Sequence, residues 1–207
     1  MPSEHVNRET VERRLERLRD EYGGAYVQEV DEEVSAETFE DLLEVTRDGY
    51  TGGGYAWVVR GPDQTAALTE SMPDSVEDGR RVLMILGRGS SRWGLAGGGR
   101  EDGETYEEAA VREVREETSV ECELGDPFLY RRVRTDSAGD HDERLHTLFV
   151  FFDAAYAGGH VAVQPGELNG AAWFAEPPAR MHPENEFRAD DFWDDFEADD
   201  PFDGFWE

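Results

Sequence analysis

The chain of 207 residues contains no lysine, so all 20 of its basic residues are arginines, against 49 aspartates and glutamates. Its formal net charge is −29. No stretch can supply the basic face with which proteins neutralise the phosphates of nucleic acids, and the same deficit disfavours binding to an anionic membrane surface. The composition therefore predicts no nucleic-acid partner and no membrane partner.

Cysteine and long apolar runs are equally scarce. Cys122 is the single cysteine, which excludes an intramolecular disulfide framework and a zinc site built from thiolates. No stretch reaches the roughly 18 apolar residues of a membrane-spanning helix, and the polar N-terminal segment lacks the apolar core of a secretory signal. The cytoplasm is the expected compartment.

The acidity is interpreted as a solvated surface rather than as disorder, because 38% hydrophobic and 11% aromatic residues can build a core. A net charge this far from zero destabilises a compact chain unless salt screens it. Absent lysine with abundant aspartate and glutamate resembles the proteins of salt-accumulating haloarchaea. A halophilic surface is the hypothesis that follows.

Residues 1–50 are expected to form a helical extension. Val11, Leu15 and Leu18 share one face of a helix expected over 8–22, and a second helix is expected after Ser35. This segment could brace the rest of the chain or form the contact of a homodimer.

Residues 51–182 are expected to form an α/β domain, in which a mixed sheet surrounds one helix over 106–118. A glycine-dense turn is expected over 94–99. The β-rich runs that predict the strands are 55–60, 66–69, 81–87, 127–134, 146–153, 161–163 and 171–174. Residues 183–207 form an acidic, aromatic tail with 11 acidic residues and one arginine. Its many large rings favour a tail that folds onto the domain or onto a partner.

The chemistry is concentrated on the expected helix over 106–118. Glu113, Glu116 and Glu117 fall on one helical face, where like charges repel, and Arg112 can neutralise only part of their charge. Carboxylates clustered on a rigid helix are typical ligands of Mg²⁺ or Mn²⁺. The glycines at 97–99 let the backbone approach a ligand closely. Such a loop and helix suit a metal-bridged diphosphate.

The joint spacing resembles the box of the Nudix hydrolase family, G-x5-E-x7-R-E-U-x-E-E-x-G-U, in which U is a bulky aliphatic residue. Gly98, Glu104, Arg112, Glu113, Val114, Glu116, Glu117 and Val120 occupy the specified positions. The one departure is Ser119, which stands where the box has its final glycine. That glycine typically leaves the helix at positive φ, which serine adopts at a cost of about 1 kcal/mol. The resemblance implies a Nudix-type α/β/α sandwich with a mixed sheet.

The resemblance also implies a divalent cation, Mg²⁺ or Mn²⁺. Glu116 and Glu117 match the positions that ligate it, aided by the backbone carbonyl of Gly97. Glu113 matches a position that ligates the metal or acts as the base on the attacking water.

The remaining matched residues have supporting roles in the family. Arg112 orients the carboxylates by ion pairing, and Glu104 has a secondary catalytic role at the rim. Gly98 and Gly99 are expected to contact the substrate. The implied reaction is attack of a metal-activated water on a nucleoside diphosphate-linked compound, which breaks its pyrophosphate bond.

Many relatives use a further carboxylate outside the box. The candidates here are Asp136, Asp140, Asp142, Glu143 and Glu167, of which Glu167 and Glu143 are preferred.

Two other functions share the fold. A non-catalytic module that senses nucleotides would keep the fold without turnover, although the intact glutamates favour an enzyme. An isomerase of isoprenoid diphosphates would require a catalytic cysteine, for which Cys122 is badly placed just after the box.

Overall fold

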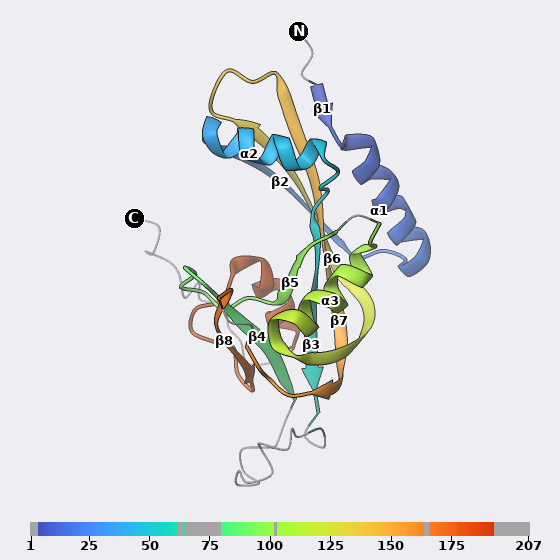
Figure 1. Ribbon diagram of the computed structural model, residues 1–207. Helices are drawn as coiled ribbons and strands as arrows, with labels where there is room; N and C mark the ends of the chain where they lie inside the picture. The colour runs from blue at the N-terminus through green and yellow to red at the C-terminus, as the bar shows by residue number, and fades with distance from the viewer. Residues whose placement is uncertain (1–3, 62–63, 65–79, 102, 164–165, 193–207) are drawn as a thin grey trace. The chain divides into compact units, whose positions relative to one another are not determined.

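The computed structural model describes residues 4–61, 64, 80–101, 103–163 and 166–192 (Figure 1). Within these residues, eight strands form one sheet in the order β2-β6-β7-β3-β4-β8, with β1 beside β7 and β5 beside β3. The strands are β1 (Glu4–Val6), β2 (Tyr26–Val34), β3 (Gly53–Arg60), β4 (Arg81–Gly87), β5 (Ala96–Gly99), β6 (Val120–Ser137), β7 (Glu143–Gly159) and β8 (Leu168–Phe174). The helices are α1 (Arg8–Tyr22), α2 (Ala36–Arg47), α3 (Tyr106–Thr118), the 3₁₀ turn η2 (Pro183–Asn185) and α4 (Glu186–Phe192).

The sheet is mixed, as expected. β2 runs parallel to β6 and β1 runs parallel to β7, whereas β4 is antiparallel to both β3 and β8. The α/β fold class is therefore confirmed. No helix in the described ranges is long and apolar enough to cross a membrane.

The chain divides into two compact units. The first unit comprises residues 1–55, 97–110 and 126–152, and the second comprises 56–96, 111–125 and 153–207. The division of the sequence at residues 50 and 182 stays a prediction.

In the first unit, both expected helices are present. α1 buries Val11, Leu15 and Leu18. Ser35 caps α2 by accepting a hydrogen bond from the backbone N–H of Thr38 at 3.2 Å. Beneath α2, Phe39 packs in a cluster with Leu43 of α2 and Leu145 of β7.

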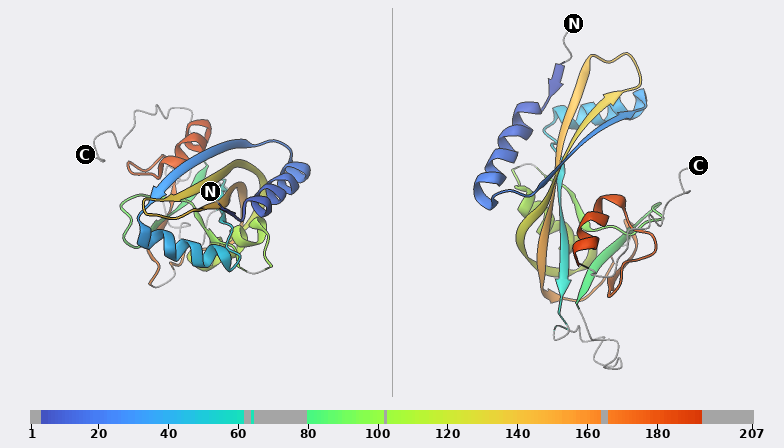
Figure 2. Two further views of the ribbon diagram at one scale, coloured as in Figure 1. Left: turned by 90° about the horizontal axis from the view of Figure 1, so that it is seen from above. Right: turned by 180° about the vertical axis from the view of Figure 1, so that it is seen from behind.

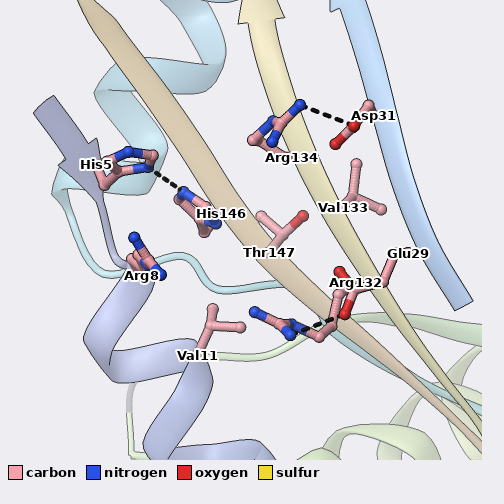
Figure 3. A pocket seen from close by; sticks show the side chains of 10 residues that line it. All are labelled: His5, Arg8, Val11, Glu29, Asp31, Arg132, Val133, Arg134, His146 and Thr147. Carbon is pink, nitrogen blue, oxygen red and sulfur yellow. Dashed lines mark hydrogen bonds and ion pairs between the residues drawn. The ribbon is translucent and has the colours of Figure 1, made fainter. Parts of the chain in front are cut away.

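The extension also contains a strand that the sequence did not predict: β2 lies between α1 and α2 in the chain and runs along β6 (Figures 1 and 2). Two of its acidic side chains meet arginines of β6: Glu29 is 2.8 Å from Arg132, and Asp31 is 2.7 Å from Arg134 (Figure 3). These four residues face each other in register across the two parallel strands. These ion pairs between strands thus help to stabilise β2, although the acidic sequence of β2 does not by itself predict a strand.

In the second unit, the core lies between the sheet and the C-terminal half of α3. Val114 of α3 packs in one cluster with Ala56 and Val58 of β3 and with Leu83 and Ile85 of β4. Because Val114 lies between Glu113 and Arg115 in sequence, its burial fixes which side chains of α3 face outwards.

The acidic tail folds onto the second unit as far as it is described. Phe192 of α4 makes an edge-to-face contact with the fully buried Trp57, at 5.7 Å between ring centroids. Ala189 of the same helix is fully buried. Five further rings of the tail lie outside the described residues: Trp193, Phe196, Phe202, Phe205 and Trp206.

Two local expectations are wrong. Residues 161–163 are not a strand, although they carry two valines. The glycines at 97–99 belong to β5, not to a turn. The run expected at 66–69 lies outside the described residues.

Candidate active site

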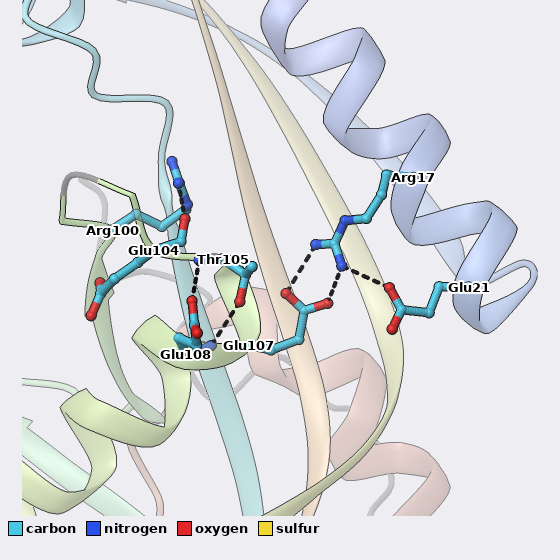
Figure 4. A network of polar contacts seen from close by, with 7 residues as sticks. All are labelled: Arg17, Glu21, Arg100, Glu104, Thr105, Glu107 and Glu108. Carbon is cyan, nitrogen blue, oxygen red and sulfur yellow. Dashed lines mark hydrogen bonds and ion pairs between the residues drawn. The ribbon is translucent and has the colours of Figure 1, made fainter.

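Helix α3 begins with a capping box. The backbone N–H of Thr105 donates to the Glu108 carboxylate at 2.8 Å, and the N–H of Glu108 donates to the Thr105 hydroxyl at 3.2 Å (Figure 4). These two bonds satisfy N–H groups that a helix start otherwise leaves without partners. The signal is present in the sequence as Thr-x-x-Glu, at residues 105–108.

An ion pair ties the first turn of α3 to α1 within the first unit. The guanidinium of Arg17 bonds both oxygens of Glu107, at 2.6 and 2.9 Å, and also bonds Glu21 at 2.8 Å (Figure 4). Burial alone would raise the pKa of Glu107, but hydrogen bonding and charge from Arg17 outweigh it, so that the pKa is lowered. Glu107 is therefore held in its charged form.

The glycines before the helix allow a close approach of two strands. Gly97 has φ of 154°, and a Cβ there would lie 2.4 Å from the Gly54 carbonyl oxygen and 2.6 Å from the Tyr55 Cα. Both neighbours are backbone atoms that cannot move aside, so no other residue fits at Gly97 without moving β3 or β5. Gly98 and Gly99 follow it in β5.

Glu104 organises the loop between β5 and α3. Its carboxylate accepts a hydrogen bond from the backbone N–H of Glu101 at 2.9 Å, and its backbone carbonyl accepts one from the guanidinium of Arg100. A supporting role for Glu104 agrees with these contacts. Its catalytic role stays a prediction.

In the second unit, Arg112 links two of the predicted metal ligands. Its Nη1 lies 2.9 Å from Glu113 Oε1 and 3.0 Å from Glu116 Oε2. The Glu116 side chain is 53% exposed, that of Glu113 is only 18% exposed, and Glu117 is buried. The three carboxylates of the helix thus range from exposed to buried, and Arg112 pairs with two of them, Glu113 and Glu116.

Burial raises the pKa of Glu113, and the neighbouring Arg112 opposes this shift. The charges of Glu116 and Glu167 raise the pKa further. Glu167 is therefore close enough to act on Glu113, although it stands 54 residues later in the sequence. A carboxylate with a raised pKa accepts a proton more readily, which is the property required of a general base.

The acidic face of α3 suits a divalent cation for two reasons, the chemical type of its donor atoms and its negative charge. Three carboxylates supply hard oxygen ligands, one of them buried, and one arginine leaves them with excess negative charge. Within the described ranges, no three Asp, Glu, His or Cys side chains already converge in a ligating arrangement.

The helix ends as the sequence comparison predicts. Ser119 has φ of 58°, in the left-handed region that the box normally reserves for glycine. Its N–H bonds the Arg115 carbonyl at 2.8 Å, and its hydroxyl bonds the Ala162 carbonyl at 3.4 Å. The substitution thus preserves the path of the chain, and the serine adopts the backbone conformation of the glycine.

The other candidates are placed differently. Glu143 lies in the first unit and pairs with Arg47 of α2 at 2.9 Å. Asp136 pairs with Arg144, also at 2.9 Å. Burial raises the pKa of Cys122 to about 11, which makes it a poor nucleophile and argues against the isomerase.

Comparisons with known proteins place the chain in a family. A family model described as the NUDIX domain matches residues 75–196. The chain is 35% identical over 97 residues to the nucleoside triphosphatase NudI of Salmonella heidelberg, covering 44% of this chain and 67% of that protein. It is 37% identical over 87 residues to the same enzyme of Salmonella schwarzengrund, covering 40% of this chain and 60% of that protein.

Among solved structures, a MutT Nudix hydrolase from Burkholderia pseudomallei matches with a TM-score of 0.45 and 23% identity, over 68% of this chain and 95% of that chain. An ADP-ribose pyrophosphatase from Streptococcus suis matches with a TM-score of 0.39 and 14% identity, over 62% of this chain and 78% of that one. The family model covers more than half of the sequence, and it includes the whole of the box from Gly98 to Val120. The chain therefore belongs to the Nudix family.

Proposed function

We propose that the chain is a divalent-metal-dependent hydrolase that cleaves the pyrophosphate bond of a nucleoside diphosphate-linked compound. The observation that carries the proposal is the contact of Arg112 with Glu113 and Glu116, on the helix that also buries Glu117. The name of the relative from Salmonella heidelberg, a nucleoside triphosphatase, supports the same substrate class. In a nucleoside triphosphate, the group linked to the diphosphate is itself a phosphate.

Each residue has a role in this proposal. Glu113, Glu116 and Glu117 would hold Mg²⁺ or Mn²⁺, which supplies charge neutralisation at the phosphates and lowers the pKa of a water. Glu113 is either a third ligand or the base that accepts the proton of the attacking water, and in the first case Glu167, whose charge acts on Glu113, is the preferred candidate for the base. Arg112 orients Glu113 and Glu116.

The reaction consumes only the substrate and one water molecule. The water oxygen forms a bond to phosphorus while the bridging P–O bond breaks, which gives a nucleoside phosphate and a second phosphate. The water proton passes to the carboxylate. The roles of the Gly97 carbonyl, Glu104, Glu143 and the Gly98–Gly99 backbone in this site stay predictions.

A substrate panel with a matched pair of variants tests the proposal. ADP-ribose, dinucleoside polyphosphates, NADH and nucleoside triphosphates, ordinary and oxidised, would be assayed with Mg²⁺ or Mn²⁺. Glu117→Gln removes one ligand, so we expect the rate to fall by at least about 100-fold and Mn²⁺ affinity, measured by electron paramagnetic resonance, to fall with it. Glu123→Gln, at an exposed glutamate outside the box, should change neither.

Two outcomes would contradict the enzyme. No hydrolysis of any compound by the folded wild-type protein would do so. If the Glu117→Gln variant hydrolyses the substrate at the wild-type rate, the proposed metal ligands are not needed for the reaction. A change in nucleotide affinity without turnover would favour the alternative, a nucleotide-sensing module.

We further propose that the acidic surface is adapted to high salt, on the basis of the net charge of −29 and the absence of lysine. Molar salt shortens the screening length to about 3 Å and so weakens self-repulsion. Thermal unfolding followed by circular dichroism should shift upwards across a KCl series. An unfolding midpoint that does not depend on KCl would exclude the adaptation.

A cytoplasmic location and a homodimer through residues 1–50 also stay predictions.

A further inference from the structure

Two arginines of the first unit converge on one buried hydroxyl. Arg14 extends from α1 and Arg100 follows β5, and both donate through Nη1 to the side-chain oxygen of Thr51. The Arg100 bond is 3.0 Å long, and Thr51 is only 1% exposed. Two positive charges are thus brought together around an uncharged acceptor.

Within the described part of the chain, neither guanidinium forms an ion pair. Among the described residues, no carboxylate oxygen lies within 4.0 Å of Arg14 or Arg100. This is unusual in a chain with 49 acidic residues, where Arg17 of the same helix bonds two glutamates. Both arginines are only partly buried, so the cost of their mutual repulsion is moderate, and an anion held between them would relieve it.

The electrostatics of Arg100 agree with this reading. Burial lowers the pKa of Arg100 and the charge of Arg14 lowers it further, whereas the nearby Tyr106 and Glu104 oppose this shift only in part. In addition, the Nε–H of Arg100 is buried and has no hydrogen-bond partner within the described part of the chain. The guanidinium of Arg100 therefore has one N–H group that donates neither to Thr51 nor to the Glu104 carbonyl.

A cavity of about 230 Å³ opens beside the two arginines. Tyr50 and Gly49 also line it, and so do two acidic residues, Asp48 and Glu101. The two acids offset much of the local positive charge. A small ligand with one or two negative charges therefore fits better than a polyanion, which the acids would repel.

We propose that this cavity binds a phosphate-type anion, either inorganic phosphate or a phosphate monoester, between Arg14 and Arg100. Paired guanidinium forks match the tetrahedral oxygens of such a group. The site lies wholly within the first unit, and it does not require that the chain hydrolyse any substrate.

Arginine-specific labelling of the wild-type protein tests the site without any variant. The protein is treated with phenylglyoxal in the presence of a chelator, with and without inorganic phosphate at constant ionic strength, and modified positions are read by mass spectrometry. Phosphate should slow the modification of Arg14 and Arg100 at least threefold. Arg13, an exposed neighbour on the same helix, should react at the same rate in both conditions. Equal protection of all three arginines, or of none, would overturn the proposal.

Variants then measure affinity by calorimetric titration of phosphate into the metal-free protein. The double substitution Arg14→Gln and Arg100→Gln should weaken binding at least tenfold, whereas Arg13→Gln should stay within twofold of wild type. If the double variant does not fold, as judged by circular dichroism, Arg14→Lys alone keeps the charge but loses the fork, and binding should weaken about threefold or more. Unchanged affinity in a folded variant would refute the site.

A second titrant distinguishes the two sources of the anion. Adenosine monophosphate is titrated in parallel with inorganic phosphate. Binding at least tenfold tighter for the monoester assigns the cavity to a nucleotide phosphate, and equal or weaker binding assigns it to free phosphate. If neither binds to the folded wild-type protein, the proposal fails, whatever the substrate panel shows for hydrolysis.

Discussion

Arg17 bonds both carboxylate oxygens of Glu107, at 2.6 and 2.9 Å, and so joins the N-terminal helix to the first turn of the helix that carries the box. We expect Arg17→Met or Glu107→Gln to lower the free energy of unfolding by about 1 kcal/mol each. In a double-mutant cycle the two losses should not add, because either change removes the same contact. Urea unfolding measures the cycle. Arg13→Gln serves as the control, and fully additive losses would show that the pair contributes nothing.

Arg112 should be a positioning residue, because one of its nitrogens contacts both Glu113 and Glu116. Arg112→Gln is expected to lower kcat about 10- to 100-fold, as for other residues that hold metal ligands in place. Arg112→Lys, which keeps the charge, should recover part of the loss. Arg115→Gln changes an exposed arginine on the same helix and should leave kcat unchanged. Steady-state kinetics at saturating Mg²⁺ would contradict this role if Arg112→Gln behaved like Arg115→Gln.

Ser119 offers a stabilising substitution. Its φ of 58° carries a penalty for any residue with a Cβ, and Ser119→Gly removes the penalty but increases the freedom of the unfolded chain. The net gain should be about 0.5 kcal/mol, seen as a small rise in Tm. Ser119→Val, with a branched Cβ, should instead lose about 1–2 kcal/mol. A Tm that rises for valine or falls for glycine would be inconsistent with the left-handed conformation.

His146 should make stability depend on pH. Burial lowers its pKa to about 4, and the nearby charges of His5, Arg8, Arg132 and Arg134 add to the shift (Figure 3). Between pH 6.5 and 4 the unfolded chain binds a proton that the native chain does not, so stability falls as the pH falls through this window.

Urea unfolding at pH 7.5 and pH 5.0 tests this dependence. The loss of stability between the two values should be about 1 kcal/mol smaller in His146→Gln than in wild type. The control variant His160→Gln changes an exposed histidine, and its free energy of unfolding should fall between pH 7.5 and pH 5.0 by as much as that of the wild type. The same loss in His146→Gln as in wild type would mean that His146 titrates normally.

The sequence predicted those elements whose signal is local. The helix over 8–22 matches α1 in its bounds, because three buried residues at helical spacing mark it and Gly23 ends it. The helix over 106–118 likewise matches α3. Both signals depend only on residues within one or two turns.

The elements that the sequence did not predict depend on distant partners. β2 is stabilised by arginines about 100 residues later in the chain, so its own acidic sequence does not suggest a strand. β5 is a strand of glycines because β3 comes too close for a Cβ, which no local pattern reveals. For the same reason the nearness of Glu167 to Glu113 could only be guessed from sequence, whereas the three glutamates of α3 are fixed by spacing alone.

The acidic strand β2 has a further consequence for association. It is the first strand in the sheet order, and in the described part of the chain it pairs only with β6. Its other edge therefore offers backbone groups to which a strand of another molecule could add. Its acidic residues outnumber the arginines that pair with them, since Arg132 and Arg134 balance Glu29 and Asp31 but Glu32 and Glu33 follow. The net negative charge that remains on this strand would oppose its pairing with the same strand of a second molecule.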